Sequence, residues 1–133
     1  MRAGGWTDVA AVSAGGVVGA EARYAVGELL PHAAGEVPWS TVVVNVSGCF
    51  LIGVLMAVLA VLSRRARPPR VARPFLGVGV LGGYTTFSTY ALEAHQLAAA
   101  GRLAVALTYA VGALAAALAA VWAGTALTRR ALR

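Results

Sequence analysis

Hydrophobic residues along the chain fall into four long runs separated by short polar segments. The runs cover about residues 9–30, 39–62, 75–97 and 103–127. A helix needs about 20 apolar residues to cross the roughly 30 Å hydrocarbon layer of a bilayer, so each run is long enough for one crossing. The pattern predicts an all-α membrane protein with four transmembrane helices. These helices form a single transmembrane domain over residues 1–133, with no room for a separate soluble domain.

The runs differ in how uniformly apolar they are. The first is the weakest, because Glu21, Arg23 and Glu28 lie in its second half and Pro31 ends it. The second is the clearest, since it has no charged residue and starts at Trp39, a residue type common at membrane interfaces. The fourth is rich in alanine and glycine, which let neighbouring helix backbones approach closely.

The third run is interrupted by residues that disfavour a continuous helix. Gly82 and Gly83 are followed by the hydroxyl residues Thr85, Thr86, Ser88 and Thr89. We expect the helix to be broken at Gly82-Gly83. Unwound backbone at membrane depth is tolerated only inside protein or beside a watery cavity, so a break indicates a site for ions. The alternative is a glycine kink that only allows close packing.

Composition and charge support a membrane protein with a preferred orientation. Apolar residues make up 59% of the chain, charged residues 12%, and the mean hydropathy is +0.76. The net charge of +6 comes from arginines at the ends of the runs, which favours membrane orientation over nucleic-acid binding. No segment is read as a cleaved signal.

Four crossings place both termini and the middle connector on one side of the membrane. That side carries Arg2, Arg64, Arg65, Arg67, Arg70, Arg73, Arg129, Arg130 and Arg133, against Arg102 and Arg23 on the other. The asymmetry predicts a multi-pass protein of the plasma membrane with its termini and middle connector in the cytoplasm.

Three segments resemble, in order and spacing, the signatures of the bacterial fluoride channel family. Residues 82–90 read GGYTTFSTY and resemble its GGxTTFSTF signature. Residues 15–24, GGVVGAEARY, resemble GGxxGAxxRY, and residues 41–53, TVVVNVSGCFLIG, resemble TxxVNxxGxFxxG. The resemblance covers most of the chain from residue 15 to about residue 109, and it implies a fluoride-specific channel subunit that lowers cytoplasmic fluoride by passive export.

The resemblance also implies an assembly and a bound ion. Two subunits would pack in opposite orientations around two fluoride pores, as a homodimer or as a heterodimer with a homologous subunit. A structural sodium ion that is not transported would lie at the dimer centre. Its ligands would be backbone carbonyls that map by motif onto Gly82 and Thr85, and oxygen ligands of this kind suit a hard cation.

A fluoride path must replace the water around a small anion with hydrogen-bond donors or the positive edges of aromatic rings. Asn45 supplies an amide donor, with an interhelical hydrogen bond as the rival interpretation. Phe87 and Tyr90 are three residues apart and share a helix face, and Ser88 and Thr89 are candidate hydroxyl partners. The family has phenylalanine where Tyr90 stands, and a phenol adds a donor and narrows the passage.

Further residues are weaker candidates for the path. Arg23 can attract an anion or extend to the lipid headgroups. Tyr109 matches a tyrosine of the family's last helix, but the serine expected four residues later is Ala113. Glu21 lies outside the resemblance and receives no transport role.

Two other functions compete with a fluoride channel. The first is a small proton-coupled multidrug exporter that uses Glu21, although Arg23 beside it opposes proton exchange. The second is a non-conducting partner subunit of a heterodimeric fluoride channel, which the arginine asymmetry favours. An enzyme is not expected, because His32 and His95 lie isolated near predicted helix ends and Cys49 is interpreted as a small core residue.

Overall fold

The computed structural model describes residues 4–33, 35–65 and 69–132, which are almost entirely helical. Helix α1 spans Gly4–Leu29, α2 spans Trp39–Arg65 and α5 spans Leu103–Ala131. The third run consists of three pieces, η1 (Arg73–Val80), α3 (Leu81–Tyr84) and α4 (Phe87–Ala99). The prediction of an all-helical chain with four helical runs is confirmed.

The break in the third run lies at Thr85 and Thr86, so its predicted position at Gly82-Gly83 is wrong. Both glycines lie inside α3, whereas Thr85 has ψ 159° and Thr86 has φ −146° and ψ 124°, both extended. Gly83 instead allows close packing, because a Cβ there would come 2.5 Å from the carbonyl oxygen of Gly16, whereas a Cβ on Gly82 would meet nothing within 4 Å. The threonines suit unwound backbone because their hydroxyls bond to nearby main-chain groups.

Local sequence signals account for the ends of the other pieces. Helix α1 stops before Pro31, and α2 starts directly after Pro38. Helix α4 is capped at its start by Thr86, whose Oγ1 accepts a hydrogen bond of 3.2 Å from the Thr89 N–H. It ends before Gly101, which adopts φ +75°, a conformation that glycine takes without steric cost.

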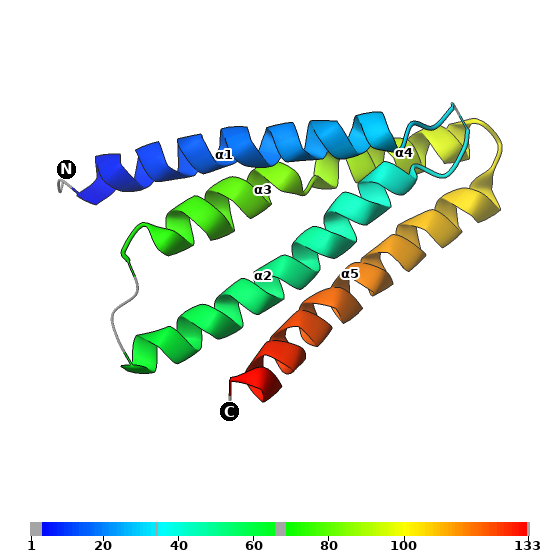
Figure 1. Cartoon of the computed structure of the whole chain (residues 1–133). Coiled ribbons are helices and arrows are strands. Elements are labelled where there is room, and N and C mark those ends of the chain that lie inside the picture. Colours follow the sequence, from blue (N-terminus) through cyan, green and yellow to red (C-terminus); the bar gives the residue numbers. More distant parts are fainter. Residues whose placement is uncertain (1–3, 34, 66–68, 133) are drawn as a thin grey trace.

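The helices pack in two groups (Figure 1). Helix α1 runs along η1 and α3, while α2 packs along α5 and α4 also contacts α5. The start of α1, the end of α2 and the end of α5 lie toward one end of the molecule, and the α1–α2 and α4–α5 connections lie at the other. The chain ends therefore share one end with the middle connector, as the four-run pattern requires.

Glycines bring the backbones of α1 and η1 together. A side chain on Gly15 would overlap the Phe75 carbonyl, and one on Gly19 would overlap the Val80 carbonyl. Segment η1 is a π-helix, in which the Leu81 N–H donates to the carbonyl of Leu76, five residues back. The glycine motif of the first run is thus a packing surface for the third.

The surface of the chain is strongly apolar. Exposed fractions reach 78% for Leu29, 72% for Trp122 and 67% for Val111. The segments Trp39–Ser63 and Leu103–Ala131 are each long and apolar enough to span a membrane. The first run is interrupted by charges and the third by its break. Apolar exposure on this scale is expected where lipid or another subunit covers the helices.

Candidate functional site

Asn45 on α2 holds the broken backbone in place. Its Nδ2 donates to the Thr86 carbonyl over 2.9 Å, and its Oδ1 accepts from the Thr86 N–H over 2.8 Å. One amide side chain therefore satisfies both main-chain groups of an unwound residue, which confirms the interhelical hydrogen bond expected of Asn45. An amide nitrogen has two N–H donors, and the second has no partner among the described residues.

The carbonyls of Gly82 and Thr85 are among those at the break that lose the donors a continuous α-helix would provide. In such a helix the Thr86 N–H would donate to Gly82, and the Thr89 N–H would donate to Thr85. Here Thr86 donates to Asn45, and Thr89 donates to the Thr86 hydroxyl. The carbonyls of Gly82 and Thr85 are thereby released from the helical pattern. Gly82 is exposed, and a side chain added there would meet nothing within 4 Å.

An open hollow of about 220 Å³ lies beside the break. Its lining comprises Asn45, Cys49, Thr85, Thr86, Phe87, Tyr90, Ala113, Leu114 and Ala117. The Phe87 side chain is 79% exposed, and its ring centroid lies 5.8 Å from that of Tyr90. The expected pairing of the two rings on one helix face is confirmed. Cys49 is half-buried and lines the hollow, so its interpretation as a core residue is wrong.

The phenol of Tyr90 is engaged by the neighbouring helix. Its hydroxyl donates to the carbonyl of Ala110 on α5 over 2.5 Å, and its ring lies 5.4 Å from that of Tyr109. The group that distinguishes Tyr90 from phenylalanine is therefore held by α5.

The predicted hydroxyl partners lie at the start of α4. The Thr86 hydroxyl donates to Thr89 Oγ1 over 2.9 Å, and the exposed Ser88 hydroxyl lies 3.4 Å from Thr86 Oγ1. Ser88 and Thr89 lie in the first turn of α4 and Thr86 caps it, so all three are at the positive end of the helix dipole.

Glu93 on α4 is a buried polar residue that the sequence analysis missed. Its Oε1 accepts from the Thr41 hydroxyl over 2.9 Å, and its Oε2 accepts from the Tyr109 hydroxyl over 2.8 Å. His32 Nε2 lies 3.9 Å from Glu93 Oε1, so the prediction that His32 is isolated is wrong. A carboxylate inside an apolar run is itself a signal of function, and that signal could have identified Glu93.

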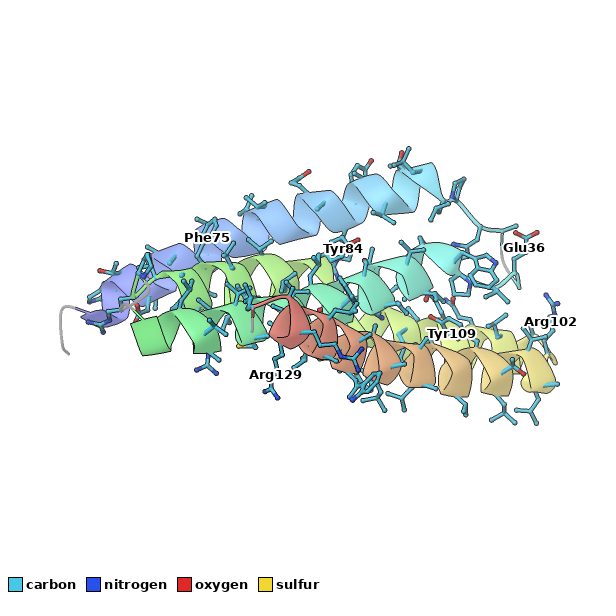
Figure 2. All side chains as sticks on the ribbon, turned by 60° about the horizontal axis from the view of Figure 1, so that its bottom comes forward. Glu36, Phe75, Tyr84, Arg102, Tyr109 and Arg129 are labelled. Carbon is cyan, nitrogen blue, oxygen red and sulfur yellow. The ribbon has the colours of Figure 1, made fainter. Side chains whose placement is uncertain are left out.

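Hollows adjoin this polar cluster on two sides. A hollow of about 540 Å³ between α2 and α5 is lined mainly by apolar residues and includes Tyr109 and Ala113. Ala113 also lines the hollow at the break, so the two hollows are neighbours. A small hollow of about 70 Å³ has His32, Glu36 and Glu93 in its lining. Figure 2 shows Glu36 and Arg102 at the end of the molecule where the connections lie.

Two charged residues of the first run lie apart from these hollows. Glu21 is exposed and Arg23 is half-buried, and neither lines the hollow at the break. In the described part of the chain Arg70 pairs with Asp8 and His32 lies near Glu93, whereas Glu21 and Arg23 do not pair. His95 is exposed on α4.

Helix α2 is long enough to span a membrane, and it holds the interrupted third run open beside a hollow lined by aromatic residues. This arrangement is typical of helical membrane proteins that conduct ions. Comparison with known proteins then gives the family. The profile described as "CrcB-like protein, Camphor Resistance (CrcB)" matches residues 10–125. The chain belongs to this family of fluoride-specific ion channels, which confirms the motif resemblance and the expectation that it is not an enzyme.

Individual relatives match over most of the chain. "Fluoride-specific ion channel FluC 1" of Streptomyces coelicolor is 48% identical over 94% of this chain and 79% of the relative. "Fluoride-specific ion channel FluC 2" of Nocardia farcinica is 49% identical over 90% of this chain and 83% of the relative. "Fluoride-specific ion channel FluC" of Nitrobacter winogradskyi is 42% identical over 93% of this chain and 97% of the relative.

Proposed function

We propose that this chain is a subunit of a fluoride channel that lets the anion leave the cell passively through the hollow beside the helix break. The single observation that supports this most strongly is the pairing of Asn45 with Thr86, because it keeps the backbone between α3 and α4 unwound at membrane depth. Family membership supports the choice of fluoride as the ion and removes the support for a multidrug exporter.

The hollow offers donors that suit a small anion. The second N–H of Asn45, the first turn of α4 and the edge of the exposed Phe87 ring all belong to one region. Each presents partial positive charge, and together they can replace the water around fluoride without a full positive charge that would trap it. Ser88, Thr89 and Tyr90 supply further polar groups near this region.

The polar cluster of Thr41, Glu93 and Tyr109 lies beside this path, toward the α1–α2 connection. The hydroxyls of Thr41 and Tyr109 both donate to Glu93, which fixes their positions. Arg23, on α1, does not line the hollow at the break, and it is the candidate for attracting the anion toward the protein. Ala113 leaves the wall between the two hollows without a hydroxyl.

We place the structural sodium ion at the carbonyls of Gly82 and Thr85. Both carbonyls lack their usual helical donors, and the negative end of the helix that stops at Tyr84 adds a favourable field. Two carbonyls do not fill the coordination of a cation, so a second subunit would supply the remainder. The exposure of Gly82 and the open space around it support a partner at this point.

The same incompleteness supports an antiparallel dimer in the plasma membrane. Phe87 is largely exposed beside an open hollow, and a second subunit would close that hollow. The arginine asymmetry puts the termini in the cytoplasm. It also favours the second candidate function, in which this chain is one half of a heterodimer with a homologue of opposite bias.

Fluoride efflux from liposomes tests the proposal. Purified protein is reconstituted into liposomes that contain fluoride, and efflux is followed with a fluoride electrode. A cation ionophore is added at the start, so that cations leave with the fluoride and no opposing voltage builds up. Rapid efflux without a proton gradient, and no comparable chloride efflux, is expected. Efflux that requires a proton gradient would contradict a passive channel. Efflux only after a second homologue is added would favour the heterodimer.

A further inference from the structure

A hollow of about 320 Å³ lies between the end of α2 and the start of η1, far from the break. It is lined by Met56, Leu59, Ala60, Ser63, Pro69, Arg70 and Arg73. The residues divide by chemistry, because Met56, Leu59 and Ala60 form an apolar wall on α2 while the two arginines and Ser63 are polar. We call this the arginine hollow. Fluoride conduction as proposed above makes no use of it.

The polar part of the arginine hollow suits a phosphate ester. Guanidinium groups match phosphate oxygens in geometry and charge, and a serine hydroxyl adds a donor. Arg70 and Arg73 are both exposed. The Arg70 guanidinium lies 3.6 Å from Asp8, but the Arg70 side chain is 75% exposed, and an ion pair in that setting contributes little. Arg70 therefore remains able to bind an anionic ligand.

The apolar part of the hollow indicates the source of the phosphate. Ser63 follows directly on the apolar segment Trp39–Leu62, and Leu59 and Ala60 lie one turn earlier. The arginines thus lie where a membrane-spanning helix meets the headgroup layer. A soluble phosphate has no apolar group that could contact the apolar wall. A phospholipid can bind the arginines with its headgroup and pack its acyl chain along α2.

We propose that the arginine hollow binds a phospholipid with a net negative charge, such as phosphatidylglycerol. The observation behind the proposal is one concave surface that joins two exposed arginines to an apolar helix wall at the membrane boundary. A zwitterionic lipid carries its own cation, which the arginines repel, so the site discriminates by headgroup charge. The lipid fixes the junction between α2 and η1.

Native mass spectrometry of the full chain in detergent tests the proposal. Phosphatidylglycerol and phosphatidylcholine are titrated separately, and the lipid-bound fraction is measured. Phosphatidylglycerol is expected to bind more tightly than phosphatidylcholine. The double variant Arg70→Gln/Arg73→Gln is expected to lose about thirtyfold in affinity for phosphatidylglycerol, the scale of two arginines at a membrane surface.

The matched control is Arg129→Gln/Arg130→Gln, which removes the same charge from the last turn of α5, outside the hollow. This control is expected to keep most of the affinity. Equal losses in the two double variants would overturn the proposal, because they would show a general attraction by net charge. Equal binding of phosphatidylcholine and phosphatidylglycerol would overturn it as well.

Two single variants keep the test decisive if the double variant does not fold. Asp8→Asn removes the carboxylate beside Arg70 and is expected to change phosphatidylglycerol binding only slightly, because that ion pair contributes little. Ala60→Trp fills the hollow from an exposed position and is expected to weaken binding with both arginines present. Unchanged affinity in Ala60→Trp would overturn the site.

Soluble glycerol phosphate serves as the arm without acyl chains. It is expected not to bind at the concentrations at which phosphatidylglycerol does, and comparable binding would overturn the assignment to a lipid. Fluoride efflux by each variant, measured at fixed lipid composition, keeps this result separate from the proposed function. A protein that binds the lipid but does not conduct fluoride would contradict the proposed channel function and leave the proposed lipid site standing.

Discussion

At the scale of single residues, Asn45 and Glu93 organise the polar interior in different ways. Asn45 pairs with the main chain of Thr86 and keeps a helix open. Glu93 gathers the hydroxyls of Thr41 and Tyr109 from two other helices. A buried polar group costs free energy unless it is bonded, so each of these residues requires its partners.

The first prediction concerns Asn45→Asp. A carboxylate can accept from the Thr86 N–H but cannot donate to the Thr86 carbonyl, and it places negative charge in the path of an anion. We expect fluoride efflux from liposomes to fall by about tenfold or more, the equivalent of about 1.4 kcal/mol or more in the barrier. Thr128→Val is the control, because the Thr128 hydroxyl bonds to the Gly124 carbonyl within α5 and lines neither of the two neighbouring hollows. Unchanged efflux in Asn45→Asp would mean that the ion does not pass this residue.

The second prediction concerns Phe87→Ile. The side chain is largely exposed in the subunit, so its loss should leave the fold intact, but isoleucine has no aromatic edge with positive charge. We expect fluoride efflux to fall sharply while size-exclusion behaviour stays normal. Leu92→Ile, at another exposed position of α4, should conduct like the parent protein. Equal efflux from both variants would exclude a role for the ring.

The third prediction concerns Glu93→Ala. The change leaves the buried hydroxyls of Thr41 and Tyr109 without their acceptor, and each buried polar group left unsatisfied costs about 1–3 kcal/mol. We expect a clear drop in the thermal stability of the detergent-solubilised protein. Tyr109→Phe removes one of these bonds and should cause a smaller drop. A neutral effect of Glu93→Ala would show that the cluster does not support the packing of α4.

At the scale of helices, glycines decide how closely the segments pack, because they let the backbone of the opposite helix come into contact. Helix α1 approaches η1 and α3 along Gly15 and Gly19, and α2 approaches α5 where Gly53 faces Val121 and Gly124 faces Phe50. Side chains at these positions would overlap carbonyl groups of the opposite helix. Interlocked backbone of this kind is the main source of helix association where lipid removes the hydrophobic driving force.

The fourth prediction compares two glycines of α1. A methyl group on Gly19 would overlap the Val80 carbonyl and press on the Tyr84 nitrogen, whereas one on Gly16 would meet nothing within 4 Å. We expect Gly19→Ala to cost about 1–3 kcal/mol through overpacking. Gly16→Ala should be neutral or stabilising by up to about 1 kcal/mol, because alanine favours a helix. Thermal aggregation in detergent gives the order, and equal melting temperatures would contradict the close approach.

At the scale of the whole molecule, charge is distributed unevenly between the two ends. Among residues with described side chains, Arg70, Arg73, Arg129 and Arg130 lie toward the end that holds the termini. Arg102 lies at the other end, and Arg23 lies in the half of α1 that leads to it. Arg2, Arg67 and Arg133, which entered the orientation prediction, lie outside the described residues, as do the side chains of Arg64 and Arg65. The bias within the described part has the same sign as the one counted from the sequence.

The fifth prediction concerns orientation. In a Cys49→Ser background, Arg130→Cys should react with a membrane-impermeant maleimide only after right-side-out vesicles are permeabilised, because the arginine-rich end faces the cytoplasm. Arg102→Cys should react in sealed vesicles. Half-labelling at both positions would indicate insertion in both directions and favour an antiparallel homodimer. Labelling at one position only would favour a partner of opposite bias.

Several features could be predicted from the sequence because they depend on local chemistry. Helix ends follow from Pro31, Pro38 and Gly101, and the four runs follow from hydropathy. The aromatic pair of Phe87 and Tyr90 follows from helical spacing. The break was misplaced at Gly82-Gly83, because glycine serves both unwound backbone and close packing, and only the position of α1 shows that Gly83 serves packing.

The sequence by itself thus determined the class of protein, the number of helical runs and the charge bias, since hydropathy and net charge add along a chain whatever its partners are. Only the tertiary structure decided where the third run unwinds, because the choice depends on Asn45 reaching Thr86 across 41 positions of sequence. It also brought Glu93 to Thr41 and His32. Hydrogen bonds between distant segments exist only once the helices have packed, so no local pattern specifies them.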